Sequence, residues 1–338
     1  MSLELDARAV FAAHQTFHPR FGWLKKAFDG VSSDPGIFNS ESAMMQLGVG
    51  KNMVEAIRFW GQSFKVISSD IAAGKRKGQF TTTHLGELIF QDEFGLDPFL
   101  ENPSTLWLLH WFALTAPSDL PLWRLMFNEY SAVEFKIEEF ASFVDEQISG
   151  TSWRIPVQAS LEKDIDCLIR MYSTRAARGR QTIDDLMDSP FRMLEAIAPS
   201  PAGEGHFRLS LGPKPHLTEL VILYCAIDFM LTSDSSSLSA TSTRLARDSG
   251  SPGRIFKLSE EEIIQNLESA CRGIKSCSLV SPAGTTQLVI NESHDVSAKE
   301  SLEGIYRKTI PIRFSRVVGG PLRQSSETLD LALKDAKK

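Results

Sequence analysis

The 338-residue sequence lacks the features of several common classes of protein. It has four cysteines, and none of them forms a C-x-x-C pair or has a histidine at the spacing of a zinc site. Its longest apolar run, WLLHWFALTA at 107–116, is too short to cross a bilayer. These absences predict reduced thiols in a cytoplasmic protein, with no structural zinc and no contact with a membrane.

Motifs of the common nucleotide-dependent and hydrolytic enzymes are absent as well. The chain has no G-x-x-x-x-G-K-[ST], no G-x-G-x-x-G, no H-E-x-x-H and no G-x-S-x-G. Its first residues include two acids and no basic segment, so we expect no signal peptide. An ATP site, a dinucleotide site and the common protease or esterase sites are therefore not predicted.

The chain also lacks an overall excess of positive charge, since 36 Lys and Arg stand against 42 Asp and Glu, a net charge of −6. The charge is unevenly distributed: residues 1–78 carry ten basic and seven acidic side chains, whereas the remainder has a net charge of −9. A locally basic region on an acidic protein is typical of a nucleic-acid contact confined to one domain. The alternative is a chance asymmetry of composition.

Apolar residues at helical spacing dominate the chain, with short strand pairs between them, so we predict a mainly α (α+β) fold. Its length is enough for two or three domains. We expect an N-terminal domain at 1–118, a helical middle domain at 119–235 and a C-terminal domain at 236–338.

The clearest pattern is a helix-turn-helix at about 40–67, in which Gly48 and Gly50 separate a short helix from a longer one. The apolar stripe of the longer helix recurs every three or four residues: Met53, Ile57, Trp60, Phe64 and Ile67. A hairpin with a basic tip follows at about 68–84. This order of elements predicts a winged helix.

A winged helix can bind double-stranded DNA, because a helix fits the major groove and a basic wing reaches neighbouring phosphates. The predicted DNA contacts lie on the second helix and on the wing: Lys51, Asn52, Arg58, Gln62, Lys65, Lys75, Arg76 and Lys77. A winged helix used for protein contact is the alternative.

The C-terminal domain shows a related but smaller pattern. Residues 250–258 predict a turn and a short strand, and Ser259 with Glu262 forms a capping box that begins a helix. The segment at 277–290 then reads as a hairpin, so we predict a second, winged-helix-like module. Upstream, HFRLSLG at 206–212 predicts an isolated strand.

Two groups of polar residues have the chemistry that phosphodiester hydrolysis requires, namely bases, acids and cations. The first group is His14, Arg20 and Lys26, within HQTFHPRFGWLKKAFDG at 14–30. The second is Asp97, Glu101 and His110, which could hold Mg²⁺ or Mn²⁺. For each group the alternative is structural: an N-terminal plug with solvated lysines, and a core histidine in an apolar helix.

Four blocks occur in this order along nearly the whole chain: HQTFHPRFGWLKKAFDG, LGVGKNMVEAIRFWG, DPFLENPSTLWLLHW and PGRIFKL. Together they resemble the SspB family of the Ssp DNA-phosphorothioation systems. The resemblance implies a nucleoid-associated DNA-nicking component that acts with a cysteine desulfurase, an ATP-dependent sulfur-transfer protein and an ATPase. A homodimer is compatible with these expectations.

Two functions follow from these observations. The first is a metal-assisted nicking endonuclease that hydrolyses one strand of duplex DNA for antiphage phosphorothioate modification. The second is a non-catalytic DNA-binding adaptor that positions the sulfur-transfer partners. The residues favour binding, because the winged helix is evident and a nuclease site is not, whereas the resemblance favours nicking.

Overall fold

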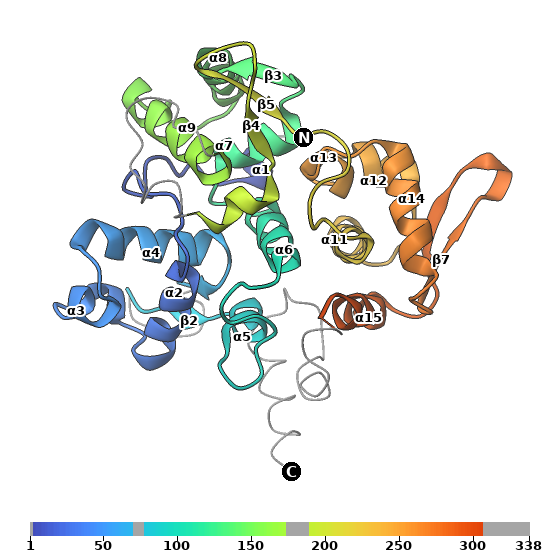
Figure 1. Ribbon diagram of the computed structural model, residues 1–338, viewed down its shortest axis with the longest axis horizontal. Helices are drawn as coiled ribbons and strands as arrows, with labels where there is room; N and C mark the ends of the chain where they lie inside the picture. Colours follow the sequence, from blue (N-terminus) through green and yellow to red (C-terminus); the bar gives the residue numbers. More distant parts are fainter. Residues whose placement is uncertain (1–2, 70–77, 174–188, 307–338) are drawn as a thin grey trace. The chain divides into compact units, whose positions relative to one another are not determined.

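The computed structural model describes residues 3–69, 78–173 and 189–306 (Figure 1). These residues are mostly helical, with small antiparallel sheets, which confirms the predicted α+β class. They divide into two compact units. Unit 1 comprises 1–102 and 112–210, and unit 2 comprises 103–111 and 211–338. This division differs from the three segments predicted, because the apolar run at 107–116 is itself shared between the units.

Unit 1 contains the elements that precede residue 210, apart from α6. They are α1 (Leu3–Asp6), α2 (Trp23–Ser33), η1 (Ile37–Asn39), α3 (Ala43–Leu47), α4 (Lys51–Ser63), β1 (Ile67–Ser68), β2 (Thr81–Thr82), α5 (His84–Phe90), α7 (Pro121–Arg124), η3 (Leu125–Glu129), β3 (Glu134–Lys136), α8 (Ile137–Ser149), α9 (Gln158–Tyr172), η4 (Pro190–Leu194), β4 (Ile197–Pro199) and β5 (His206–Leu209).

The predicted pair of helices is present as α3 and α4. Helix α3 ends at Leu47 because Gly48 adopts a left-handed conformation with φ 64°, and Gly50 is the N-cap of α4. The apolar stripe is confirmed at Ile57 and Trp60, which are fully buried. After α4 the chain forms the antiparallel pair β1–β2, as predicted, and then enters α5.

Helices α2 and α5 cover this segment from the core side. Helix α2 packs against α4, and Ala27 and Phe28 on α2 are buried. In α5, a Cβ atom at Gly86 would lie 2.3 Å from the carbonyl oxygen of Val66. The glycine therefore permits the close approach of the helix to the backbone just before β1.

A second small sheet in unit 1 has the order β3-β5-β4, with both pairs antiparallel. The segment predicted as an isolated strand is thus the central strand, β5, which pairs with the neighbouring β4 on one side and with the distant β3 on the other. Helix α8 packs against β3 and α9, and α9 packs against β4 (Figure 1).

Unit 2 begins with most of α6 (Pro103–Leu114), whose residues 112–114 belong to unit 1. Its other elements are α11 (Glu219–Ser233), β6 (Ser239–Thr241), α12 (Ser242–Arg247), α13 (Pro252–Ile255), α14 (Glu260–Cys271), β7 (Cys277–Val280), η5 (Pro282–Gly284), β8 (Gln287–Ile290) and α15 (His294–Tyr306).

The sheet of unit 2 has the order β6-β8-β7, all antiparallel, so the predicted hairpin at 277–290 is confirmed. The capping box at the start of α14 is also confirmed, since the Ser259 hydroxyl and the Glu262 carboxylate each accept from the other's backbone N–H. Residues 252–255, expected to include a short strand, instead form the helical turn α13, which Ser251 caps. None of the described helices has the length and hydropathy needed to cross a bilayer.

Candidate functional site

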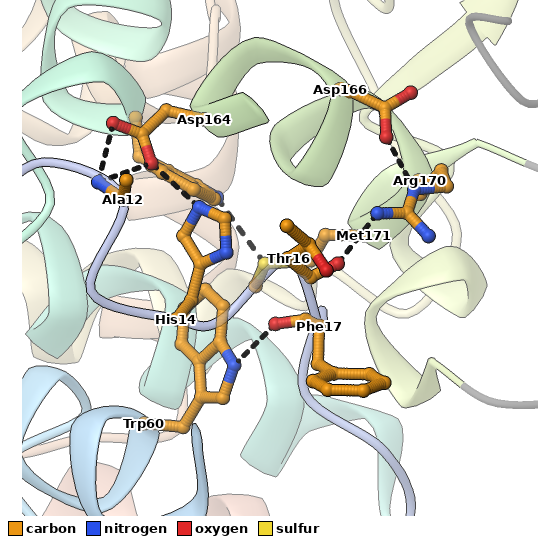
Figure 2. A network of polar contacts seen from close by, with 10 residues as sticks. Ala12, His14, Thr16, Phe17, Trp60, Asp164, Asp166, Arg170 and Met171 are labelled. Carbon is orange, nitrogen blue, oxygen red and sulfur yellow. Dashed lines mark hydrogen bonds and ion pairs between the residues drawn. The ribbon is translucent and has the colours of Figure 1, made fainter. Parts of the chain in front are cut away.

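The segment that precedes α2 follows an irregular path and is held in place by side chains of α4 and α9. Ala12, Gln15 and Thr16 all have positive φ angles, which are costly for residues with a side chain. The indole of Trp60 donates to the Phe17 carbonyl at 2.9 Å, and Arg170 donates to the Thr16 carbonyl at 2.6 Å (Figure 2). The path of this segment is therefore set by tertiary contacts.

His14 and Asp164 form the centre of this network. The His14 Nε2 atom lies 2.6 Å from the Asp164 Oδ1 atom, and both oxygens of Asp164 accept from the Ala12 backbone N–H, at 2.9 and 3.0 Å (Figure 2). The imidazole ring stacks on Trp60 and meets the edge of Trp123. One carboxylate of α9 thus fixes both the backbone and a side chain of the N-terminal segment.

Burial determines what this pair can do chemically. His14 is 1% exposed and Asp164 is 2% exposed. Burial opposes a charge on the imidazole, but the neighbouring Cys167 and the hydrogen bond to Asp164 outweigh it and raise the pKa of His14 to about 10. The pair is therefore ionic at neutral pH, and it is closed to a macromolecular substrate. We assign it to anchoring the N-terminal segment.

The two other members of the first predicted group have different partners. The Lys26 ammonium donates to the Leu47 carbonyl at 2.7 Å and so satisfies the C-terminal end of α3. The Arg20 guanidinium lies over the rings of Phe17 and Trp23, at 5.8 and 5.6 Å from their centroids. His14, Lys26 and Arg20 thus each make structural contacts with different partners.

The second predicted group is also dispersed. Asp97 is buried and accepts the backbone N–H groups of Glu101 and Asn102, at 2.8 and 3.0 Å, ahead of α6, whereas Glu101 itself is exposed. His110 belongs to unit 2, where its ring faces Trp107 and Phe256. Burial lowers the pKa of His110 to about 3, so this imidazole is neutral.

None of these arrangements forms a metal centre. Across residues 3–69, 78–173 and 189–306, no three His, Cys, Asp or Glu side chains are grouped so that they could hold a metal ion. The alternative for the second group, a core histidine, agrees with this geometry, whereas the N-terminal plug with solvated lysines agrees only in its buried part, because Lys26 donates to the Leu47 carbonyl. The assignment of catalytic roles to these six residues stays a prediction.

The exposed face of α4 is the surface that the DNA-binding hypothesis requires. Lys51 and Asn52 are exposed in its first turn, and Arg58 and Gln62 are half-buried further along. The Gln62 amide donates to the Ser69 hydroxyl at 3.1 Å, which links the end of α4 to the hairpin. No acidic residue lies in the first turn of the helix.

The remaining predicted DNA contacts follow α4 in the sequence. Lys65, which follows α4 with φ 57°, donates to the carbonyl and the hydroxyl of Thr115 at 2.8 and 3.0 Å, so its ammonium is used inside unit 1. Lys75, Arg76 and Lys77 lie outside the described residues.

Asp164 is the residue that sequence reasoning missed. It occupies an apolar position of α9, at helical spacing from the buried Leu161 and Leu168. A carboxylate on the core face of an amphipathic helix needs a buried partner. That mismatch was the available signal, although it could not identify His14 as the partner.

Comparisons with known proteins agree with this fold. Residues 11–306 match the family model described as "Protein of unknown function (DUF4007)". A solved structure described as "SspB crystal structure" is 30% identical, covers 98% of each chain and has a TM-score of 0.82. A "Magnesium ion-bound SspB crystal structure" is also 30% identical, covers 99% of this chain and 97% of the other, and has a TM-score of 0.84. A search of curated proteins finds no significant match.

The class defined by these matches is a family of mainly helical proteins of about this length. Because the likeness to the two SspB structures extends over nearly the whole of both chains, the chain belongs to the SspB family.

The buried pair predicts a large effect of Asp164→Asn on stability. The change removes the charged acceptor of a buried pair, so the imidazole loses its counter-charge and gives up its proton, and we expect a loss of about 3 kcal/mol in the free energy of unfolding. Asp166→Asn, on the same helix, is the matched control. Its ion pair with Arg170 is partly exposed, so we expect a loss of about 0.5 kcal/mol. Urea unfolding of both variants measures the difference, and equal losses would contradict the anchoring role.

The raised pKa of His14 predicts a pH dependence of stability. The pKa is about 10 in the folded protein against an ordinary 6.5, so the folded state retains a proton that the unfolded state releases. The resulting stabilisation is complete below pH 6.5 and is lost as the pH rises towards 10, with a slope of up to about 1.4 kcal/mol per pH unit. We expect the urea midpoint to fall between pH 6.5 and 9, and to fall less steeply in Asp164→Asn. Parallel slopes would rule out this origin.

Proposed function

We propose that this protein binds duplex DNA through unit 1 and acts as the DNA-binding component of an Ssp phosphorothioation system. The observation that carries the proposal is the exposed, basic start of α4, which lies in a helix-turn-helix followed by a hairpin. Membership of the SspB family supports the choice of system.

The connections around the hairpin support its assignment as a wing. The Phe80 N–H donates to the Pro35 carbonyl at 2.9 Å, and the Asn39 side chain donates to the Gly78 carbonyl. Both bonds join the base of the hairpin to the segment between α2 and α3. The succession α2, α3, α4, β1, β2 therefore supports the proposal of a winged helix in which α4 would be the recognition helix.

The first turn of α4 is suited to a phosphate or a base edge. Its N-cap, Gly50, provides no side-chain hydrogen bond, so the first backbone N–H groups face outward beside Lys51 and Asn52. A lysine at a helix N-terminus is unfavourable for the isolated helix, because it faces the positive end of the helix dipole. An anion bound at this position would remove that disadvantage, which favours a DNA contact at Lys51.

Unit 2 has a similar succession of elements but a different surface. The helix that corresponds to α4 is α14, and its first turn contains Glu260, Glu261 and Glu262 with no basic residue in the helix. The segment at 281–286, between β7 and β8, has no lysine or arginine either. Because phosphate would be repelled by such a face, we place the DNA contact in unit 1.

Strand nicking is the second candidate activity, with the sulfur-transfer enzymes as partners. The observation that favours it is the relative described as magnesium ion-bound. The described residues of this chain do not fit such an ion, since they contain no group of three acidic, histidine or cysteine ligands. We therefore propose the activity as a property to be tested and assign no residue of this chain to it.

The DNA proposal predicts that Lys51→Glu weakens binding to a fluorescent 20-base-pair duplex by about tenfold and lowers the salt dependence of binding by about one released counterion. The matched control is Lys163→Glu. Lys163 is equally exposed but lies on α9, so the same change in charge should leave the affinity nearly unchanged. Lys65→Met should lower the free energy of unfolding by more than it lowers the free energy of DNA binding, because the ammonium is hydrogen-bonded to Thr115. Equal losses in the two glutamate variants would mean that only the net charge matters.

The nicking candidate predicts that the purified protein converts supercoiled plasmid to the open circular form in Mg²⁺ or Mn²⁺, and that chelation stops the conversion. The reaction is followed on a gel, alone and with the three partner proteins, and duplex binding is measured in parallel. Retained binding without open circles in either mixture would leave the adaptor function and eliminate the nickase.

A further inference from the structure

Two cysteines meet at one end of α14 in unit 2. Cys271 is the last residue of this helix and Cys277 is the first residue of β7, and their sulfur atoms lie 3.6 Å apart as free thiols. A disulfide needs an S–S distance of about 2.05 Å. The connection at 272–276 contains Gly273, whose backbone freedom allows the small closing movement.

The two thiols differ in access and in proton affinity. Cys271 is half-buried, whereas Cys277, at the start of a strand, is 3% exposed. A hydrogen bond between the sulfurs lowers the pKa of Cys271 and raises that of Cys277. Cys271 is thus the accessible nucleophile, and Cys277 holds the shared proton. Cys167 and Cys225, by contrast, are fully buried.

We propose that Cys271 and Cys277 form a reversible dithiol–disulfide site that takes hydrogen peroxide as its oxidant. The Cys271 thiol loses its proton, and the thiolate attacks the O–O bond, gains an oxygen atom as a sulfenic acid and releases hydroxide, which takes up that proton and becomes water. The Cys277 sulfur then displaces the sulfenic hydroxyl, and the Cys277 proton leaves with it as a second water. Two thiols are oxidised to one disulfide, and one hydrogen peroxide is reduced to two waters.

The bond would tie the end of α14 directly to the sheet of unit 2, because Cys277 pairs with Ile290 of β8 in the register of that sheet. Both cysteines belong to unit 2, so the disulfide would lie within a single compact unit. Such transient disulfides suit a reducing compartment, where an oxidant closes them and cellular thiols reopen them.

The test uses the intact protein treated with hydrogen peroxide, quenched with iodoacetamide and digested with trypsin. Arg272 and Lys275 lie between the cysteines, so trypsin separates the peptide 258–272 from the peptide 276–299. We expect peroxide to yield these two peptides joined, two hydrogens lighter than their sum, and dithiothreitol to separate them. Untreated protein should give both peptides unlinked.

Single variants test the order of the steps. In Cys277→Ser, peroxide should leave Cys271 as a sulfenic acid that dimedone captures, whereas in Cys271→Ser the buried Cys277 should stay largely unmodified. Cys167 and Cys225 are internal controls and should remain reduced throughout. The proposal is wrong if both cysteines of the native protein remain alkylatable after peroxide, or if the linked peptides arise only from covalent dimers. Thermal unfolding of the treated variants shows that they are folded.

Discussion

The charged pair of His14 and Asp164 is the interaction on which the N-terminal part of unit 1 depends. The irregular chain at 7–22 precedes α2, with several residues in costly backbone conformations, and it holds its path because a buried carboxylate accepts from both the imidazole and the Ala12 backbone. A charge placed in the core costs free energy unless its partner is fixed beside it. The pair therefore specifies one arrangement of the segment over α4 and α9, and the indole of Trp60 reinforces that arrangement through Phe17.

The anchored N-terminal segment also determines which face of α4 is exposed. Trp60 belongs to the buried side of α4 and contacts both His14 and the Phe17 carbonyl, so the N-terminal segment covers the inner face of the helix. Lys51 and Asn52 then remain on the outer face at the start of the helix. His14 thus lies at the buried face of α4, whereas Lys51 and Asn52 are exposed at its start. The geometry supports binding at α4 and gives His14 a structural task.

Much of the local structure of both units was predictable because it depends on nearby residues. Gly48 and Gly50 mark the turn between α3 and α4, and the capping box of Ser259 and Glu262 marks the start of α14. Features that depend on distant partners were not predictable. The central place of β5 comes from its pairing with the distant β3 in addition to the nearby β4, and the shared position of α6 comes from the division of an apolar run between two units. Likewise, His14 was identified as a candidate, but its role depends on Asp164, 150 residues away.

The two units show how similar successions of elements can serve different surfaces. In unit 1 the second helix of the pair begins with a lysine and lacks a side-chain cap, which leaves its N–H groups available to an outside anion. In unit 2 the corresponding helix begins with Ser259 and three glutamates, so its own side chains already satisfy the N-terminal N–H groups and repel phosphate. The end of that helix instead holds a pair of thiols. A cap that closes a helix start to ligands is thus as informative about function as a basic residue that opens one, and it supports placing the proposed DNA contact in unit 1.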